Sequence, residues 1–123
     1  MVTLTTDLGY RDPYLGIVKA ELYLKNQGIQ IIDLSCDIKD NSLGDAAFIL
    51  KNSLPHFPKG TIHLVAVKQI ADKSDLSKAK DVDNTRYLLT YFRDQYIITP
   101  DNGLFTLLDP GFSSPVYQLY FED

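Results

Sequence analysis

The chain has little cysteine, no tryptophan and no concentration of positive charge. Its one cysteine, Cys36, excludes an internal disulfide and favours a reducing, cytoplasmic setting. The formal net charge is −4 and no Lys/Arg cluster is present, which argues against a nucleic-acid partner. No stretch approaches the ~18 consecutive apolar residues of a spanning helix, so we expect no membrane association.

What remains is the composition of an ordinary globular domain. The 123 residues are 45% hydrophobic and 23% charged, enough to bury one core. Apolar, β-branched runs at residues 2–6, 30–34 and 61–67 alternate with helical patterns at residues 12–26 and 43–54. This alternation predicts an α/β fold with a mainly parallel, Rossmann-like sheet flanked by helices in three layers.

Capping signals mark the start of both expected helices. Asp12 is placed to cap the first helix, with Pro13 at its first helical position. Ser42 and Asp45 have the spacing of a capping box that opens the second helix.

The second half of the chain has a different pattern. Residues 68–84 are polar and charged, and predict a surface loop or a short solvated helix. Residues 87–92 and 96–99 predict a β-hairpin that turns at residues 93–95. A turn at residues 100–103, a short helix to residue 108 and a last strand at residues 116–121 follow. We expect one domain over residues 1–123, in a chain shorter than its relatives.

The polar end of the first strand is the main candidate site. Thr6 and Asp7 end that strand, and a helix begins near Asp12. In open α/β sheets, ligands bind in the crevice outside the carboxyl ends of the strands. There the Asp7 carboxylate could accept two hydrogen bonds from a ribose diol, or it could stabilise its own turn. Asp12 is better suited to capping than to ligand binding.

Other reactive side chains give weaker signals. Cys36 as a nucleophile would need a neighbouring base, and neither His56 in a loop nor His63 in a strand is a convincing one. The two histidines lack the spacing of zinc ligands, and we expect no metal. Asp33 and Asp37 either belong to a polar loop or line the same crevice as Asp7, where the three carboxylates could hold Mg²⁺.

Six segments in order resemble the S-adenosylmethionine (SAM) hydrolases that form adenosine, also called SAM hydroxide adenosyltransferases. The SAM-dependent fluorinase and chlorinase are related to them. The resemblance covers about residues 2–108. The segments are residues 4–9 (LTTDLG), Asp12 with Tyr14, Gly16 and Lys19, residues 32–35 (IDLS) with residues 37–38 (DI), residues 46–48 (AAF), residues 57–61 (FPKGT) and residues 100–104 (PDNGL).

The resemblance implies an N-terminal α/β domain, a further β-rich domain and a homotrimer. SAM, a substrate rather than a cofactor, would lie between domains of neighbouring subunits, where water attacks the ribose C5′. Asp7 matches the family residue that binds the ribose hydroxyls, and Asp12 matches the neighbouring carboxylate. The resemblance also assigns substrate binding to Thr6, Asn41 and Asn102.

The departures from the family fall on its catalytic residues. Lys68 stands where the aspartate of an Asp-Arg-His triad is expected, and Arg86 is the candidate for the arginine across a longer loop. Cys36 replaces the usual histidine, and the triad histidine belongs to a segment beyond residue 123. We therefore expect the N-terminal domain of a SAM hydrolase-like enzyme, inactive as an isolated chain. The alternative is a module that binds SAM or adenosine without turnover, or an assembly domain.

Overall fold

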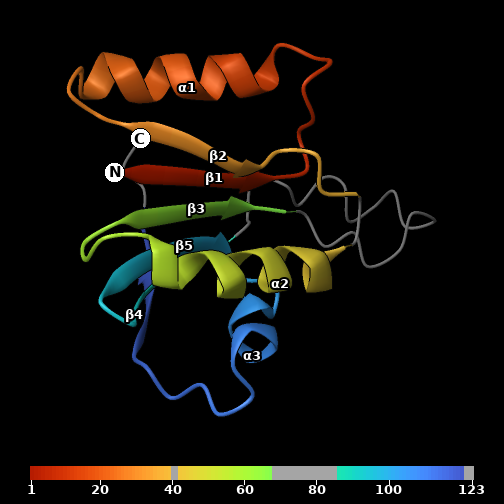
Figure 1. Ribbon diagram of the computed structural model, residues 1–123, viewed down its shortest axis with the longest axis vertical. Helices are drawn as coiled ribbons and strands as arrows, with labels where there is room; N and C mark the ends of the chain where they lie inside the picture. Colours follow the sequence, from red (N-terminus) through yellow and green to blue (C-terminus); the bar gives the residue numbers. More distant parts are fainter. Residues whose placement is uncertain (40–41, 68–85, 121–123) are drawn as a thin grey trace.

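The computed structural model describes residues 1–39, 42–67 and 86–120. Its centre is a six-stranded sheet with the order β2-β1-β3-β5-β4-β6 (Figure 1). β1 pairs in parallel with β2 and β3, and β3 with β5, whereas β4 is antiparallel to both β5 and β6. The predicted mainly parallel sheet is confirmed. The strands are β1 (Val2–Thr6), β2 (Ile31–Ser35), β3 (Ile62–Ala66), β4 (Tyr87–Phe92), β5 (Gln95–Pro100) and β6 (Val116–Leu119).

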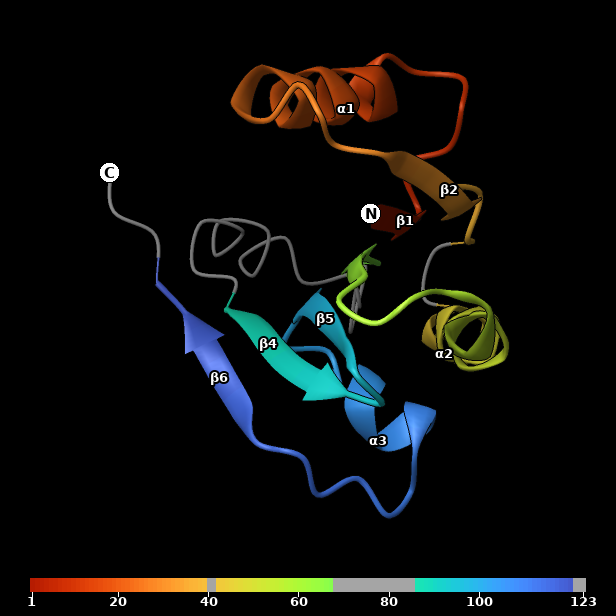
Figure 2. The ribbon, with the colours of Figure 1, turned by 60° about the vertical axis from the view of Figure 1, so that its left-hand side comes forward.

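Helices lie on both faces of this sheet, as Figure 2 shows. They are α1 (Tyr14–Lys25), α2 (Leu43–Ser53) and α3 (Leu104–Leu108), with a 3-10 turn, η1 (Leu54–His56), after α2. α1 covers one face over β2 and β1, where Leu15 packs with Val2, Leu4 and Cys36. α2 and α3 lie together on the other face. The three-layer arrangement predicted from the sequence is therefore confirmed.

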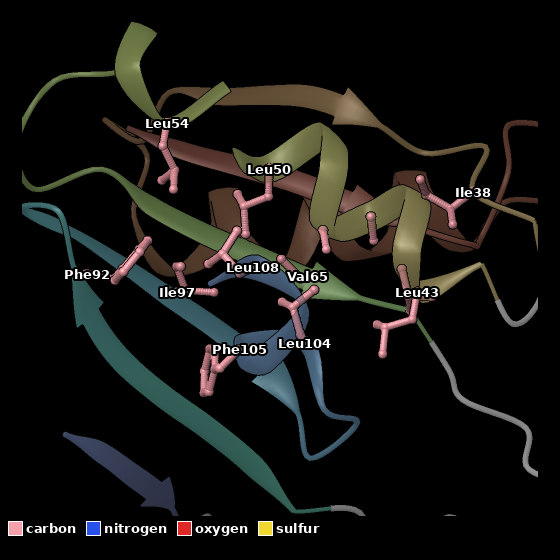
Figure 3. Close-up of a cluster of buried hydrophobic side chains, with 13 residues drawn as sticks. Ile38, Leu43, Leu50, Leu54, Val65, Phe92, Ile97, Leu104, Phe105 and Leu108 are labelled. Carbon is pink, nitrogen blue, oxygen red and sulfur yellow. The ribbon is translucent and has the colours of Figure 1, made fainter. Parts of the chain in front are cut away.

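The larger core lies between the sheet and the pair α2 and α3 (Figure 3). Leu50 of α2 and Ile97 of β5 are fully buried, and Leu104 and Leu108 of α3 are 1% exposed. Burying each such side chain stabilises the fold by about 1.5–3 kcal/mol. This cluster fixes α2 and α3 against the strands whose carboxyl ends form the candidate site.

Both predicted capping arrangements are wrong. Pro13, not Asp12, occupies the N-cap position of α1, and its carbonyl accepts the Ile17 N–H at 3.0 Å. Ser42 does precede α2, but its side chain makes no capping hydrogen bond, so the capping box with Asp45 does not form. The Ser42 backbone carbonyl instead accepts the Asp45 N–H at 3.1 Å.

Two strand features depend on tertiary structure. β2 is an edge strand and is only half-buried, because it has a neighbour on only one side. The β4–β5 hairpin is confirmed, but Arg93 and Asp94 alone form its turn, with φ values of 52° and 64°. Positive φ at both central residues defines the type I′ turn, whose twist matches that of paired strands.

Several sequence predictions concern residues outside the described ranges. These are the surface segment 68–84, Asn41 and Lys68. Within the described ranges, no helix has both the length and the apolar character needed to cross a membrane.

Candidate functional site

The carboxyl ends of β1, β2 and β3 meet at one edge of the sheet, and Asp7 lies there. The Asp7 N–H donates to the Ala66 carbonyl at the end of β3, at 3.4 Å. On the other side, the Ile38 N–H donates to the Thr6 carbonyl at 3.2 Å. The half-buried Asp7 is therefore held where β1 ends between its two neighbours, the position at which open α/β sheets bind ligands.

The chain turns sharply after Asp7. Gly9 adopts a φ of 74°, a region that glycine enters without steric cost. Its N–H donates to the Cys36 carbonyl at 2.6 Å, which ties the turn to the segment after β2. The Thr6 hydroxyl accepts the Leu8 N–H at 3.2 Å. Thr6 is buried, and its hydroxyl supports this turn. A contact between Thr6 and substrate stays a prediction.

Asn102 reaches the same edge from the loop after β5. Its Nδ2 donates to the Val67 carbonyl at 3.1 Å, one residue beyond the carbonyl that Asp7 contacts. Its Oδ1 accepts the Leu104 N–H at 3.1 Å, at the start of α3. With 7% exposure, Asn102 connects β3, β5 and α3. The structure gives it a structural role, and substrate binding by Asn102 stays a prediction.

The remaining predicted site residues are more exposed. Asp12 is exposed in the connection before α1. Arg86 lies beside Asp101, with Nη2 and Oδ2 separated by 3.8 Å, and the Asp101 N–H donates to the Arg86 carbonyl at 2.8 Å. Arg86 is therefore held next to the loop that carries Asn102. Its assignment as the triad arginine stays a prediction.

Asp33 points toward α1, where its Oδ2 lies 2.8 Å from Nζ of Lys19. The hydrogen bond to this carboxylate raises the pKa of Lys19. Asp33 lies inside β2, not in the loop after it, and Asp37 is exposed. In the part of the chain that the structure describes, no three His, Cys, Asp or Glu side chains gather as metal ligands. The Mg²⁺ alternative thereby loses its proposed ligand set.

Cys36 is fully buried, and this burial raises the pKa of its thiol. A buried, protonated thiol is a poor nucleophile, which agrees with the interpretation of the sequence. The Cys36 backbone carbonyl accepts the Gly9 N–H at 2.6 Å. This contact could not be found from the sequence, because no local pattern relates a glycine in the loop before α1 to a cysteine in another segment.

His63 belongs to a buried hydrogen-bond network, away from Asp7. Its Nδ1 lies 2.6 Å from the Thr3 hydroxyl, and its Nε2 lies 2.6 Å from Oε1 of Gln95. The Gln95 Nε2 donates to the Leu54 carbonyl at 2.7 Å, which fixes the orientation of the amide. Nε2 of His63 must therefore carry the proton and Nδ1 must accept one from Thr3. Burial lowers the pKa of His63, so the neutral ring is favoured.

A cavity of about 310 Å³ lies at the opposite edge of the sheet. Phe57 and Lys59 before β3 line it, together with Arg93 and Gln95 of the hairpin. Among the residues that the structure describes, none of the predicted site residues lines this cavity. The Asp7 edge is the candidate site because strand ends and polar groups converge there.

A family model of the SAM hydroxide adenosyltransferase N-terminal domain matches residues 2–118. The chain belongs to this family. Two curated relatives are named (R)-S-adenosyl-L-methionine hydrolase. The one from Methanocaldococcus jannaschii is 32% identical over 110 residues, covering 86% of this chain and 38% of the relative. The one from Thermus thermophilus is 32% identical over 112 residues, covering 89% and 40%.

Solved structures extend the likeness to the fold. An uncharacterized conserved protein from Thermotoga maritima superposes with a TM-score of 0.79 at 24% identity, covering 98% of this chain and 43% of that protein. A conserved hypothetical protein from Thermus thermophilus gives a TM-score of 0.69 at 28% identity, covering 97% and 46%. This member of the SAM hydroxide adenosyltransferase family therefore spans less than half the length of each of these relatives.

Proposed function

We propose that this chain forms the ribose-binding part of a SAM hydrolase, which converts SAM and water into adenosine and methionine. The observation that carries the proposal is the placement of Asp7, in a segment that matches the family, where β1 ends between β2 and β3. The names of the two curated relatives support the choice of SAM as substrate.

The chemistry requires little beyond positioning. SAM carries a sulfonium leaving group, so methionine departs as a neutral thioether without protonation. A water oxygen attacks C5′, the C5′–S bond breaks with its electron pair passing to sulfur, and the water proton passes to solvent. Aligned nucleophile and leaving group account for much of such a rate enhancement. The Asp7 carboxylate would fix the ribose by accepting hydrogen bonds from its 2′- and 3′-hydroxyl groups.

The proposed site is incomplete in this chain. The chain spans 38–40% of the length of the two curated relatives, and Lys68 stands at the expected position of a catalytic aspartate. We propose that further contacts to adenine and methionine come from another domain, in a homotrimer as the resemblance implies. The 123-residue chain then binds SAM and adenosine weakly and does not turn SAM over.

The test is to incubate the chain with SAM, separate adenosine and methionine by chromatography, and measure SAM binding by calorimetry. The Thermus thermophilus relative is the positive control for turnover, and Asp7→Ala is the control for the site. We expect weak binding that Asp7→Ala removes, and no adenosine. Adenosine formation that Asp7→Ala abolishes would show that the chain alone is a complete enzyme. Equal SAM binding by both variants would contradict the proposed site, and no SAM binding by the wild-type chain would favour an assembly role.

A further inference from the structure

The cavity at the edge of the sheet opposite Asp7 has no part in the proposed function. It lies where the loop before β3 meets the turn of the β4–β5 hairpin, and the Gly60 N–H joins the two by donating to the Asp94 carbonyl at 2.8 Å. Its volume of about 310 Å³ lies at the lower end of the range for ligand sites, which is roughly 300–1,000 Å³. The cavity therefore has room for a small molecule.

One part of the cavity wall is apolar and held in place. Leu54, Pro55 and Phe57 line it, and Leu54 is 1% exposed. The Leu54 carbonyl accepts Nε2 of Gln95, which also lines the cavity, at 2.7 Å. The Phe57 ring packs edge-on against the ring of His63, with centroids 5.6 Å apart. These contacts form the wall in the absence of a ligand, and its surface suits an apolar or aromatic group.

Lys59, Arg93 and Asp94 bring charge to the same cavity. Both oxygens of the Asp94 carboxylate have contacts: Oδ1 accepts the Tyr91 hydroxyl at 3.4 Å, and Oδ2 lies 3.8 Å from Nζ of Lys59. Within the described part of the chain, the Arg93 guanidinium has no ion-pair partner. The residues that line the cavity thus carry one net positive charge, although the formal net charge of the whole chain is −4.

The Arg93 guanidinium lies over the ring of Phe92, with Cζ 4.9 Å from the ring centroid. A guanidinium stacked on an aromatic ring keeps the N–H groups along its edge available, and a carboxylate accepts them in a bidentate pair. A phosphate monoester, at about −1.5 to −2, would exceed the single net positive charge of the cavity. The ligand whose charge and shape match this site is therefore a monocarboxylate.

The backbone at Arg93 adds an independent observation. Arg93 has a φ of 52° in the type I′ turn, a region in which glycine and asparagine are favoured and a long side chain is uncommon. Residues in such conformations cluster at ligand sites. The turn itself thus gives no reason for an arginine at this position, whereas an anion in the cavity does.

We infer that this cavity binds a small monocarboxylate with an apolar or aromatic group. The carboxylate pairs with the Arg93 guanidinium, and the apolar group packs against Phe57 and Leu54. Lys59, whose side chain is 85% exposed, adds positive charge at the opening. This site is separate from the Asp7 edge and does not depend on the proposed function.

The experiment titrates the wild-type chain with benzoate and with benzamide, and follows the amide signals of Lys59 and Gln95 by NMR. The two probes have the same shape, but only benzoate is charged. Arg93→Asn removes the guanidinium and leaves a residue that favours positive φ. Arg11→Asn is the matched control, because Arg11 is exposed in the loop before α1, at the opposite edge of the sheet. Urea unfolding reports the stability of each variant.

We expect the wild type and Arg11→Asn to bind benzoate at least about tenfold more tightly than benzamide, the effect of a charge-assisted hydrogen bond. Arg93→Asn should lose this preference, and its urea midpoint should stay the same or rise because asparagine suits the turn. No benzoate binding by the wild type, equal binding of the two probes, or a preference that survives in Arg93→Asn would overturn the inference. A lower midpoint of Arg93→Asn would assign the arginine to the turn and would also contradict it. Tighter binding of inorganic phosphate than of benzoate would contradict the choice of a carboxylate.

Discussion

Gln95 is a buried polar residue whose loss should destabilise the fold. It is 4% exposed and joins His63 to the Leu54 carbonyl through hydrogen bonds of 2.6 and 2.7 Å. Gln95→Ala would leave the Nε2–H of His63 buried without a partner, while the Leu54 carbonyl would keep the Phe57 N–H at 3.3 Å. One unsatisfied buried group costs about 1–3 kcal/mol, so the free energy of unfolding should fall by about 2 kcal/mol. That is a substantial part of the roughly 5–15 kcal/mol typical of a domain.

Urea unfolding followed by circular dichroism measures this loss, given a two-state transition. Gln118→Ala is the matched control, because Gln118 is exposed on β6, and exposed substitutions usually change stability by less than about 0.5 kcal/mol. A water that enters the space left by Gln95 would recover part of the lost hydrogen bonding. A fall of less than about 1 kcal/mol would nevertheless refute the reasoning, since it lies below the cost of even one buried unsatisfied group.

Three further perturbations test other parts of the structure. Burial lowers the pKa of His63, so the unfolded state binds a proton at a higher pH than the folded state does. The free energy of unfolding should therefore fall as the pH decreases below about 6.5, and urea titrations at about pH 7 and pH 5 should show a smaller fall for His63→Gln than for the wild type. An equal fall in both proteins would contradict this prediction. Lys19→Met removes the ion pair with Asp33 and should lower the free energy of unfolding in urea by about 1 kcal/mol, since the pair is partly solvated. An unchanged unfolding midpoint would contradict a stabilising role of this pair. Leu50→Ala should lower the free energy of unfolding by about 2–5 kcal/mol because Leu50 is fully buried. Phe48→Ala, at a 69% exposed position of the same helix, should change this free energy little. Similar losses in both variants would refute the assigned core.

Much of the fold could be predicted because the signals that determine it are local. The β-branched run in β3 and the helical spacing of Leu15 and Leu22 are readable along the chain. The cap of α1 could not be predicted, because the backbone conformation at Pro13, not the side-chain type of Asp12, determines where the helix begins. The partial exposure of β2 depends on its place in the strand order, which its own apolar sequence does not reveal.

The candidate site could be predicted only where one segment carries it. The strand, turn and helix around Asp7 follow one another in the sequence, so their edge position was predictable. Contacts between segments that are distant in the sequence could not be predicted. Lys19 and Asp33 are 14 positions apart, and His63 and Gln95 are 32 positions apart. Such pairs form only once the sheet order brings their elements together.

In the proposed function, the end of β1 binds a ribose diol through Asp7. The most direct measurement is an NMR titration of the chain with adenosine and with 2′,3′-dideoxyadenosine, in the wild type and in Asp7→Ala. Hydrogen bonds to a carboxylate predict that the wild type binds adenosine at least about tenfold more tightly than the dideoxy analogue. Asp7→Ala should lose this preference. Equal affinity of the wild-type chain for both nucleosides, or a preference that survives in Asp7→Ala, would show that Asp7 does not bind the ribose hydroxyl groups.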